Sequence, residues 1–543
     1  MVFARRSTTL LAAIIASCAM VLSLTACTSD NKTVVDGQTT VTSNSAGGVA
    51  VFTPSDGITL NQQTPLNKWA KLVPDLTKAL ADAGFKKGDI DHTTSDSLAK
   101  QSRAIQDFVV DHLSNNTTDD SGIAIAPDNM TLLVAPVVEA DASTRQYGDY
   151  VSQNLSTNDA TDEGATSDGE SSEDDSSKDD SSNTESDSTA SDEQAQAVDR
   201  LVSSLKLAKE SGMHVVLLGN SIEGYKPDAF VKFSDAQTIG KLQAEKMVSE
   251  LKLDKASKDN PKYIEVLLPY TAVDEKGNAN DSTFAQEAFR GIWQVLGSYY
   301  QKGAVESPSG TLDGKSTEND WQAVAYDAAK EGSTAKVLDK RLAKTDGQST
   351  LTRIDGIITM NDYIASEVVK ELDDLGYTGS AADINPQITI SGIVGNITGK
   401  KDLSRDAVPD PIKSPENDNA NDSSSSDDDA DEDTSASDKD RDSQWPLVTG
   451  YGAYVSNIPS IVNGKQWMTG MEDRQTIATD IAQACAKLNK DEALNSMPSI
   501  RNSEVGGVKK IPTISEPLLA VSASNLKSAL IDPGYISLAD AGL

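Results

Sequence analysis

One cysteine near the start of the chain is placed where its thiol can be acylated. Leu24-Thr25-Ala26-Cys27 ends an apolar run, Leu10 to Leu24, that follows the basic pair Arg5-Arg6. A basic start, a short apolar run and small residues at a cleavage point are typical of a bacterial export signal, and a cysteine directly after that point is typical of a lipoprotein. We therefore expect residues 1–26 to be a signal peptide, Cys27 to carry lipid and residues 27–50 to form a flexible linker.

Two other interpretations of this signal stay open. It is a plain secretory signal with an incidental cysteine, or it is a membrane anchor. The apolar run is short for an anchor, because a helix needs roughly 20 apolar residues to cross a bilayer. The lipoprotein interpretation places the protein on the extracytoplasmic face of the bacterial cell membrane, lipid-anchored at Cys27.

Side chains for catalysis or metal binding are sparse. The chain has three histidines, His92, His112 and His214, and none lies in an HExxH pattern. No GxSxG elbow or phosphate-binding loop follows a predicted strand. Cys485 lies in a segment with helical spacing, and we expect it to be a small buried apolar residue. We predict that the protein is not an enzyme and that it needs no metal and no cofactor.

A polar pair, Asn361-Asp362, directly follows the apolar segment Ile354 to Thr359. An amide beside a carboxylate at the end of a strand can hydrogen-bond the vicinal hydroxyls of a solute. The same asparagine is a good N-cap for a helix that begins at Ile364. The sequence leaves both interpretations open.

Apolar and amphipathic segments alternate along the chain, and this alternation predicts an α/β fold. We predict two Rossmann-like lobes with parallel sheets, and a ligand cleft between the lobes at the carboxyl ends of the strands. Apolar runs typical of buried parallel strands occur at 130–136, 214–218, 263–268, 354–359 and 446–449, and helical spacing occurs at 68–84, 97–112, 195–212, 285–296, 321–332 and 364–376.

Two acidic, serine-rich tracts, at about 157–193 and about 411–443, interrupt this pattern. They contain almost no apolar side chains, so they cannot bury enough surface to offset the cost of ordering the backbone, and we predict that both are disordered insertions. Calcium is the alternative for such tracts, but neither has the glycine-centred spacing of a calcium loop. The net charge of −35 argues against nucleic acid as a partner.

The order of several short motifs resembles that of a known family. Near the end of the chain these are Trp445-Pro-Leu-Val-Thr-Gly450, Ile458-Pro-Ser-Ile-Val-Asn-Gly-Lys-Gln466, Asp473-Arg474-Gln-Thr-Ile-Ala478 and Gly507-Val508-Lys-Lys-Ile-Pro512, and earlier ones are Gly57 to Trp69, Phe233 to Gln243 and Thr359 to Asp362. Together they resemble the type I periplasmic sugar-binding proteins, the substrate-binding lipoproteins of ABC importers. The xylose-binding and multiple-sugar-binding proteins are the most similar group.

This resemblance implies the type I periplasmic binding protein fold and its division into lobes. We expect an N-terminal lobe made of 51–222 plus 452–500 and a C-terminal lobe made of 223–451 plus 501–530. The first acidic insertion then belongs to the N-terminal lobe and the second to the C-terminal lobe.

The resemblance also implies where a sugar would be held. Trp69 and Trp321 match positions where aromatic rings pack near a sugar ring. The family usually places an Asp-Arg pair where this chain has Gly219-Asn220, and a Gln-Asp pair where it has Tyr451-Gly452. With these charged groups replaced, a neutral polar solute such as an oligosaccharide or a glycoside fits better. The candidate ligand-binding residues are Gln62, Trp69, Asn220, Asp235, Asn280, Asp281, Trp321, Asn361, Asp362 and Tyr451.

These observations predict an extracytoplasmic solute-binding lipoprotein. It captures a sugar or another neutral polar solute, delivers it to an ABC permease and works as a monomer. The alternative is a lipoprotein that kept the fold but acts as a sensor or an interaction partner, without transport. The replaced clamp residues motivate this alternative.

Overall fold

The computed structural model describes residues 34–35, 38–39, 46–55, 65–115, 125–138, 145–150, 153–156, 184–273, 280–343, 351–381 and 445–543. The chain forms two units, Met1–Asn44 and Ser45–Leu543. In the first, β1 (Val34–Val35) pairs antiparallel with β2 (Gln38–Thr39). Cys27, Gln62 and the acidic tracts up to 183 and from 411 to 443 lie outside the described residues. All further elements belong to the second unit.

The first sheet of this unit has seven strands, and six of them are parallel. β5 is buried at every residue and β7 at every residue except His214, which confirms that the apolar runs near 130 and 214 are parallel strands covered on both faces. The order across the sheet is β17 (Ile500–Val505), β18 (Val508–Ser515), β9 (Ala229–Lys232), β7 (His214–Leu218), β5 (Met130–Val134), β3 (Gly48–Pro54) and β4 (Ile90–Ser95).

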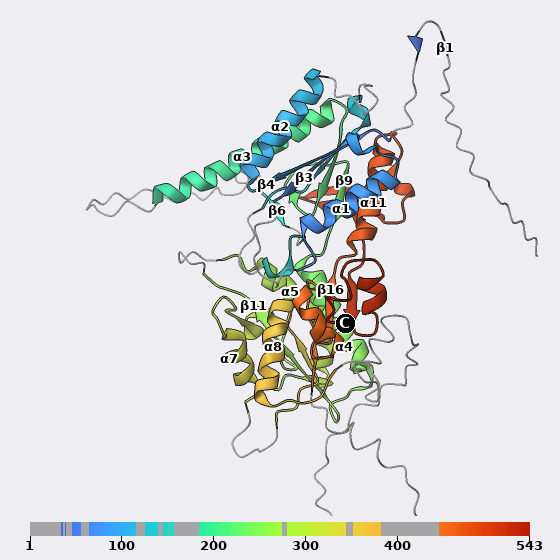
Figure 1. Cartoon of the computed structure of the whole chain (residues 1–543). Helices are drawn as coiled ribbons and strands as arrows, with labels where there is room; N and C mark the ends of the chain where they lie inside the picture. The colour runs from blue at the N-terminus through green and yellow to red at the C-terminus, as the bar shows by residue number, and fades with distance from the viewer. Residues whose placement is uncertain are drawn as a thin grey trace, which may run out of the picture. The chain divides into compact units, whose positions relative to one another are not determined.

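Helices cover both faces of this sheet (Figure 1). Alternate residues of a strand point to opposite faces, so Val49 and Val51 pack against α1 (Trp69–Asp82) and α11 (Arg474–Leu488). Ala50 and Phe52, on the other face, pack against α2 (Leu98–Asn115) and α3 (Thr184–Glu210). α3 begins well before the predicted residue 195, inside the first acidic tract.

The second sheet is smaller and wholly parallel, with the order β12 (Val305–Glu306), β10 (Lys262–Val266), β14 (Gly356–Ile358) and β15 (Leu447–Val448). A parallel bridge from Tyr451 to Gly470 continues it from β15 to β16 (Met468–Met471), which pairs antiparallel with β19 (Leu519–Ser522). The helices of this part are α4 (Ala236–Glu250), α5 (Thr283–Gln301), α6 (Trp321–Val324), α7 (Ser333–Arg341), α8 (Asp362–Leu375) and α10 (Ile458–Val462).

The two sheets begin with the same strand order. Counted along the chain, the six parallel strands of the first run 2-1-3-4-5-6 and those of the second run 2-1-3-4. In such sheets the order reverses between strands 1 and 3, and ligands bind outside the carboxyl ends of the strands at this point. The topology confirms the predicted α/β class with two parallel sheets, the arrangement of the type I periplasmic binding protein fold.

The chain passes between the sheets three times: from β9 to α4, from β16 to α11 and from β18 to β19. This differs from the expected boundaries in two ways. β9 and the hairpin β17–β18 belong to the seven-stranded sheet, although we expected 223–451 and 501–530 in the C-terminal lobe. β16 extends the four-stranded sheet, although we expected 452–500 in the N-terminal lobe. These strands pair with segments that are far away in the sequence, and the local sequence pattern does not reveal such pairing.

Short elements complete the described chain. None of the helices among the described residues is both long and apolar enough to span a membrane. Two further strand pairs are β6 (Asn154–Leu155) with β8 (Ser221–Ile222) and β11 (Leu268–Pro269) with β13 (Ala325–Tyr326), and the short helical turns are η1 (Lys87–Asp89), η2 (Pro127–Asn129), η3 (Arg145–Tyr147), η5 (Leu253–Lys255), η6 (Val455–Asn457), η7 (Leu494–Ser496) and η8 (Lys527–Ile531).

Candidate functional site

The carboxyl ends of the two sheets meet at a buried polar group made of Ser234, Tyr451 and Glu472. Ser234 follows β9 and Tyr451 follows β15, and their hydroxyl oxygens lie 2.5 Å apart. The Ser234 backbone N–H donates to Glu472 Oε1 at 2.6 Å, and the Tyr451 hydroxyl donates to the same oxygen at 3.4 Å. Burial raises the pKa of the Glu472 carboxyl to about 7 and that of Tyr451 well above its usual value.

The hydrogen bonds of Asn361 test both interpretations of its role, as an N-cap and as a solute-binding group. Its Oδ1 accepts from the backbone N–H of Ile364 at 2.9 Å, so it caps α8. Its Nδ2 donates to Gln146 Oε1 at 3.0 Å. The amide therefore faces the other sheet, as a solute-binding group would, but a side chain of the same protein holds it here.

Asp362 points into the protein instead of toward a solute. Its side chain is buried and accepts from the Tyr454 backbone N–H at 2.9 Å, from Gln466 Nε2 at 2.7 Å and from Thr469 Oγ1 at 2.9 Å. Burial raises the pKa of the Asp362 carboxyl to about 6, although these hydrogen bonds oppose the shift. In this structure Asp362 organises the loop after β15, and the pair Asn361-Asp362 does not act as one grip.

Trp69 and Asn220 lie at the carboxyl ends of the seven-stranded sheet. The buried Trp69 ring meets Tyr150 and Phe233 edge to face, with ring centroids 5.1 Å and 5.7 Å apart. The Asn220 side chain accepts from the Gln153 backbone N–H at 3.0 Å and donates to the Pro136 carbonyl at 2.9 Å. Both residues are in place as expected, but each is fully engaged with its own chain.

The remaining candidates belong to the second sheet and its approaches. Asp235 caps α4 by accepting from the Thr238 backbone N–H at 2.7 Å. Trp321 meets Tyr270 edge to face at 5.1 Å, and the Tyr270 hydroxyl donates to the carbonyl of Asn280 at 3.2 Å, which brings these two candidates together. Asp281 is exposed and accepts from the Thr283 backbone N–H at 2.9 Å.

Residues 146–150 contact several of these candidate residues, and sequence reasoning missed them. Tyr147 is buried, with its ring centroid 4.7 Å from Phe284 of α5 and 6.3 Å from Tyr451. Together with Gln146 it lies between the carboxyl ends of the two sheets, where a cleft was expected. The sequence Gln-Tyr-Gly-Asp-Tyr, with two tyrosines in a loop after a buried strand, was the available signal.

A cavity of about 280 Å³ lies elsewhere, against β9 and the hairpin β17–β18. Within the described residues, no group of three or more histidine, cysteine or acidic side chains is arranged to hold a metal ion. The cavity is lined by Gln153, Asn154, Gly219, Ser221, Phe230, Lys232, Ser503, Glu504, Val505 and Gly506.

Comparison with known proteins finds similar solved structures. A solute-binding protein of an ABC transporter from Clostridium phytofermentans, with bound β-D-glucose, matches 91% of this chain and 99% of its own, at 16% identity and a TM-score of 0.44. A carbohydrate transporter solute-binding protein from Chloroflexus aurantiacus, in complex with D-glucose, matches 92% of this chain and 98% of its own, at 18% identity and a TM-score of 0.42.

A sugar ABC transporter protein from Actinomyces odontolyticus matches 89% of this chain and 97% of its own, at 10% identity and a TM-score of 0.43. No family model matches the chain, and no curated protein does. The fold follows from the strand order within this chain.

Proposed function

We propose that this chain is an extracytoplasmic solute-binding lipoprotein. It captures a sugar or another neutral polar solute between the carboxyl ends of its two sheets and delivers the solute to an ABC permease. One observation carries the proposal: the carboxyl ends of two parallel sheets meet, where Ser234 after β9 contacts Tyr451 after β15 and Asn361 after β14 contacts Gln146. Three passages of the chain between the sheets are suited to a hinge that opens and closes around a ligand.

The side chains at this place favour a neutral solute. Asn361 and Asn220 carry amides, and Trp69, Tyr451 and Tyr454 carry aromatic rings; all five are buried against the chain itself in this structure and reach a solute when the two sheets separate. The buried carboxyls of Asp362 and Glu472 face into the protein, where hydrogen bonds hold them. The net charge of −35 also repels anions, and salt screens this repulsion.

The lipid at Cys27 would hold the protein at the outer face of the cell membrane. A tether on the outer face of the membrane raises the local concentration of the binding protein at its permease. We expect Cys27→Ser to move the protein from the membrane fraction to the soluble extracytoplasmic fraction, with solute affinity unchanged.

Calorimetric titration tests the proposal. The Cys27→Ser protein is titrated with a panel of neutral mono- and oligosaccharides that includes glucose, and we expect binding of one solute per chain. Asn361→Ser keeps an N-cap oxygen but loses the amide N–H. In a Gln146→Ala background, where the Gln146 side chain no longer accepts from this amide, we expect it to weaken binding about tenfold, as for one lost hydrogen bond. The matched control is Asn502→Ser, at an exposed position on β17.

The sensor or interaction alternative predicts a different outcome. Gln146 already occupies the amide of Asn361, so a protein that has given up transport needs no solute there. If the folded protein gives no heat of binding with any sugar of the panel, this alternative is favoured.

A further inference from the structure

Residues 146–150 reach from the seven-stranded sheet to the carboxyl ends of the four-stranded sheet. Asn361 Nδ2 donates to the Gln146 side chain at 3.0 Å, and the Tyr454 hydroxyl donates to the Gln146 carbonyl at 2.7 Å. The buried Tyr147 ring lies against Phe284 and Tyr451. Half of this segment is therefore bound to residues that follow β14 and β15 or lie on α5.

The other half is bound to the start of α1. Asp149 accepts from Lys68 Nζ at 2.8 Å and from the Trp69 backbone N–H at 3.1 Å. The Tyr150 hydroxyl donates to the Lys68 carbonyl at 2.5 Å, and its ring stacks on Phe233 with centroids 4.8 Å apart. Since each half holds a different sheet, the segment ties the two carboxyl ends together.

We propose that residues 146–150 form an internal strap that occupies the solute position and holds the two sheets closed while no solute is bound. The inference rests on the proposed function, because it concerns the same site. Gln146 offers Asn361 an amide oxygen in place of a solute hydroxyl, so Gln146 and the solute compete for one donor. The strap is part of the chain and its local concentration is high, so a solute binds only the fraction of molecules in which the strap has left.

The two ends of the strap are anchored by different kinds of contact. Gln146 is only partly buried, and it contacts the four-stranded sheet through two hydrogen bonds that water or a solute can replace. Asp149, in contrast, forms an ion pair whose two side chains are 20% or less exposed. One end of the strap is therefore held on α1 by an ion pair, and the other end is held by the replaceable hydrogen bonds of Gln146 and by the buried Tyr147 ring.

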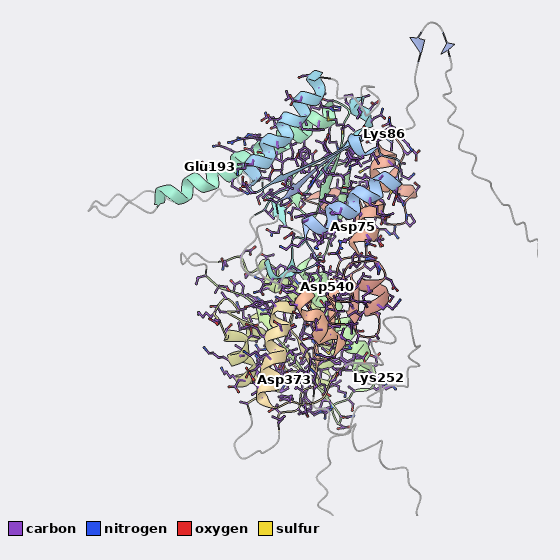
Figure 2. The ribbon with its side chains drawn as sticks, viewed as in Figure 1. Asp75, Lys86, Glu193, Lys252, Asp373 and Asp540 are labelled. Atoms are coloured by element: carbon purple, nitrogen blue, oxygen red, sulfur yellow. The ribbon has the colours of Figure 1, made fainter. Side chains whose placement is uncertain are left out.

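A distance measurement without any solute tests the strap. Spin labels are placed at Lys87→Cys and Asp374→Cys in the Cys27→Ser protein; both positions are exposed, and Cys485 is buried. Their neighbours Lys86 and Asp373 are labelled in Figure 2. We expect one narrow distance distribution in the parent protein, and a longer mean distance when Gln146→Ala and Tyr147→Ala are combined. Gln153→Ala, which lies beyond the strap, is the matched control and keeps the distance of the parent protein.

Solute affinity is the second readout. We expect the double variant to bind the solute about tenfold or more tightly than the parent, because the competitor is gone. If the double variant does not fold, the single variant Gln146→Ala, which leaves Tyr147 in place, replaces it. The same distance and the same solute affinity are then measured on the single variant. An unchanged distance together with an unchanged affinity overturns the strap. A variant that opens but binds no solute of the panel leaves the strap standing and overturns the proposed function.

Discussion

The backbone N–H of Ser234 donates a 2.6 Å hydrogen bond to Oε1 of Glu472, and this bond joins two of the three passages of the chain between the sheets. Ser234 leads from β9 into α4, and Glu472 leads from β16 into α11. Both residues are buried, and Tyr451 lies against both. A carboxyl group thus lies where the chain passes between the sheets, next to the proposed solute position.

The first prediction concerns pH. The pKa of Glu472 is raised to about 7 in the folded protein, so between its usual value and pH 7 the folded state keeps a proton that the unfolded state has lost. The contribution of Glu472 to the free energy of unfolding is therefore largest below this pH window. This contribution falls as the pH rises through the window, by at most about 1.4 kcal/mol per pH unit. Glu472→Gln should flatten this fall, as measured by denaturant unfolding at pH 5 and pH 8.

The matched control for this experiment is Glu504→Gln, at an exposed position on β17. The raised pKa of Asp362 makes the free energy of unfolding fall with rising pH as well. The informative quantity is therefore the slope of this free energy against pH in each variant, compared with the slope in the parent protein. Equal slopes of the free energy of unfolding against pH in the parent protein and in Glu472→Gln would contradict the raised pKa of Glu472.

The second prediction concerns the buried carboxyl of Asp362. Asp362→Ala leaves three donors, from Tyr454, Gln466 and Thr469, without their acceptor. We expect a loss of about 3 kcal/mol or more in the free energy of unfolding. Asp374→Ala, exposed on the same helix, should change it by about 0.5 kcal/mol or less. Similar losses at both positions would show that Asp362 does not organise the loop.

The third prediction separates backbone strain from steric clash in the strap. Gly148 has φ +97°, and a Cβ there would lie 2.5 Å from the Asn67 carbonyl oxygen. Gly376, at the end of α8, has φ +90° but open space around a Cβ. Gly376→Ala should therefore cost only about 1 kcal/mol of stability, for its backbone conformation.

Gly148→Ala should cost clearly more than Gly376→Ala in the same unfolding measurement, because the strap cannot keep its path beside Asn67. We also expect it to lengthen the distance between labels at Lys87→Cys and Asp374→Cys. Equal costs at the two glycines, with the distance unchanged, would mean that the strap tolerates the clash.

Much of the fold could be predicted because its parallel strands are covered on both faces. Strands such as β5 and β7 are therefore apolar at nearly every position, and their sequence pattern is unambiguous. The hairpin β17–β18 was assigned to the other lobe, because its pairing with β9 joins residues far apart in sequence and leaves no local mark.

The site was harder to predict for the same reason. The N-cap role of Asn361 follows from its position before α8, and the sequence already suggested it. The inward direction of Asp362 depends on Gln466 and Thr469, and nothing near Asp362 in the sequence indicates them. The strap depends on the contact between Gln146 and Asn361, which are 215 residues apart in the chain, and no spacing rule can predict such a contact.

Hydrogen exchange with and without the strongest-binding sugar of the panel tests the central claim most directly, because it locates the solute. The account predicts that amides in 359–364 and 449–454 exchange more slowly in the presence of the sugar, while amides in 146–150 exchange faster as the strap leaves. Protection confined to 503–506, which line the separate cavity, would contradict the claim that the solute binds between the carboxyl ends of the two sheets.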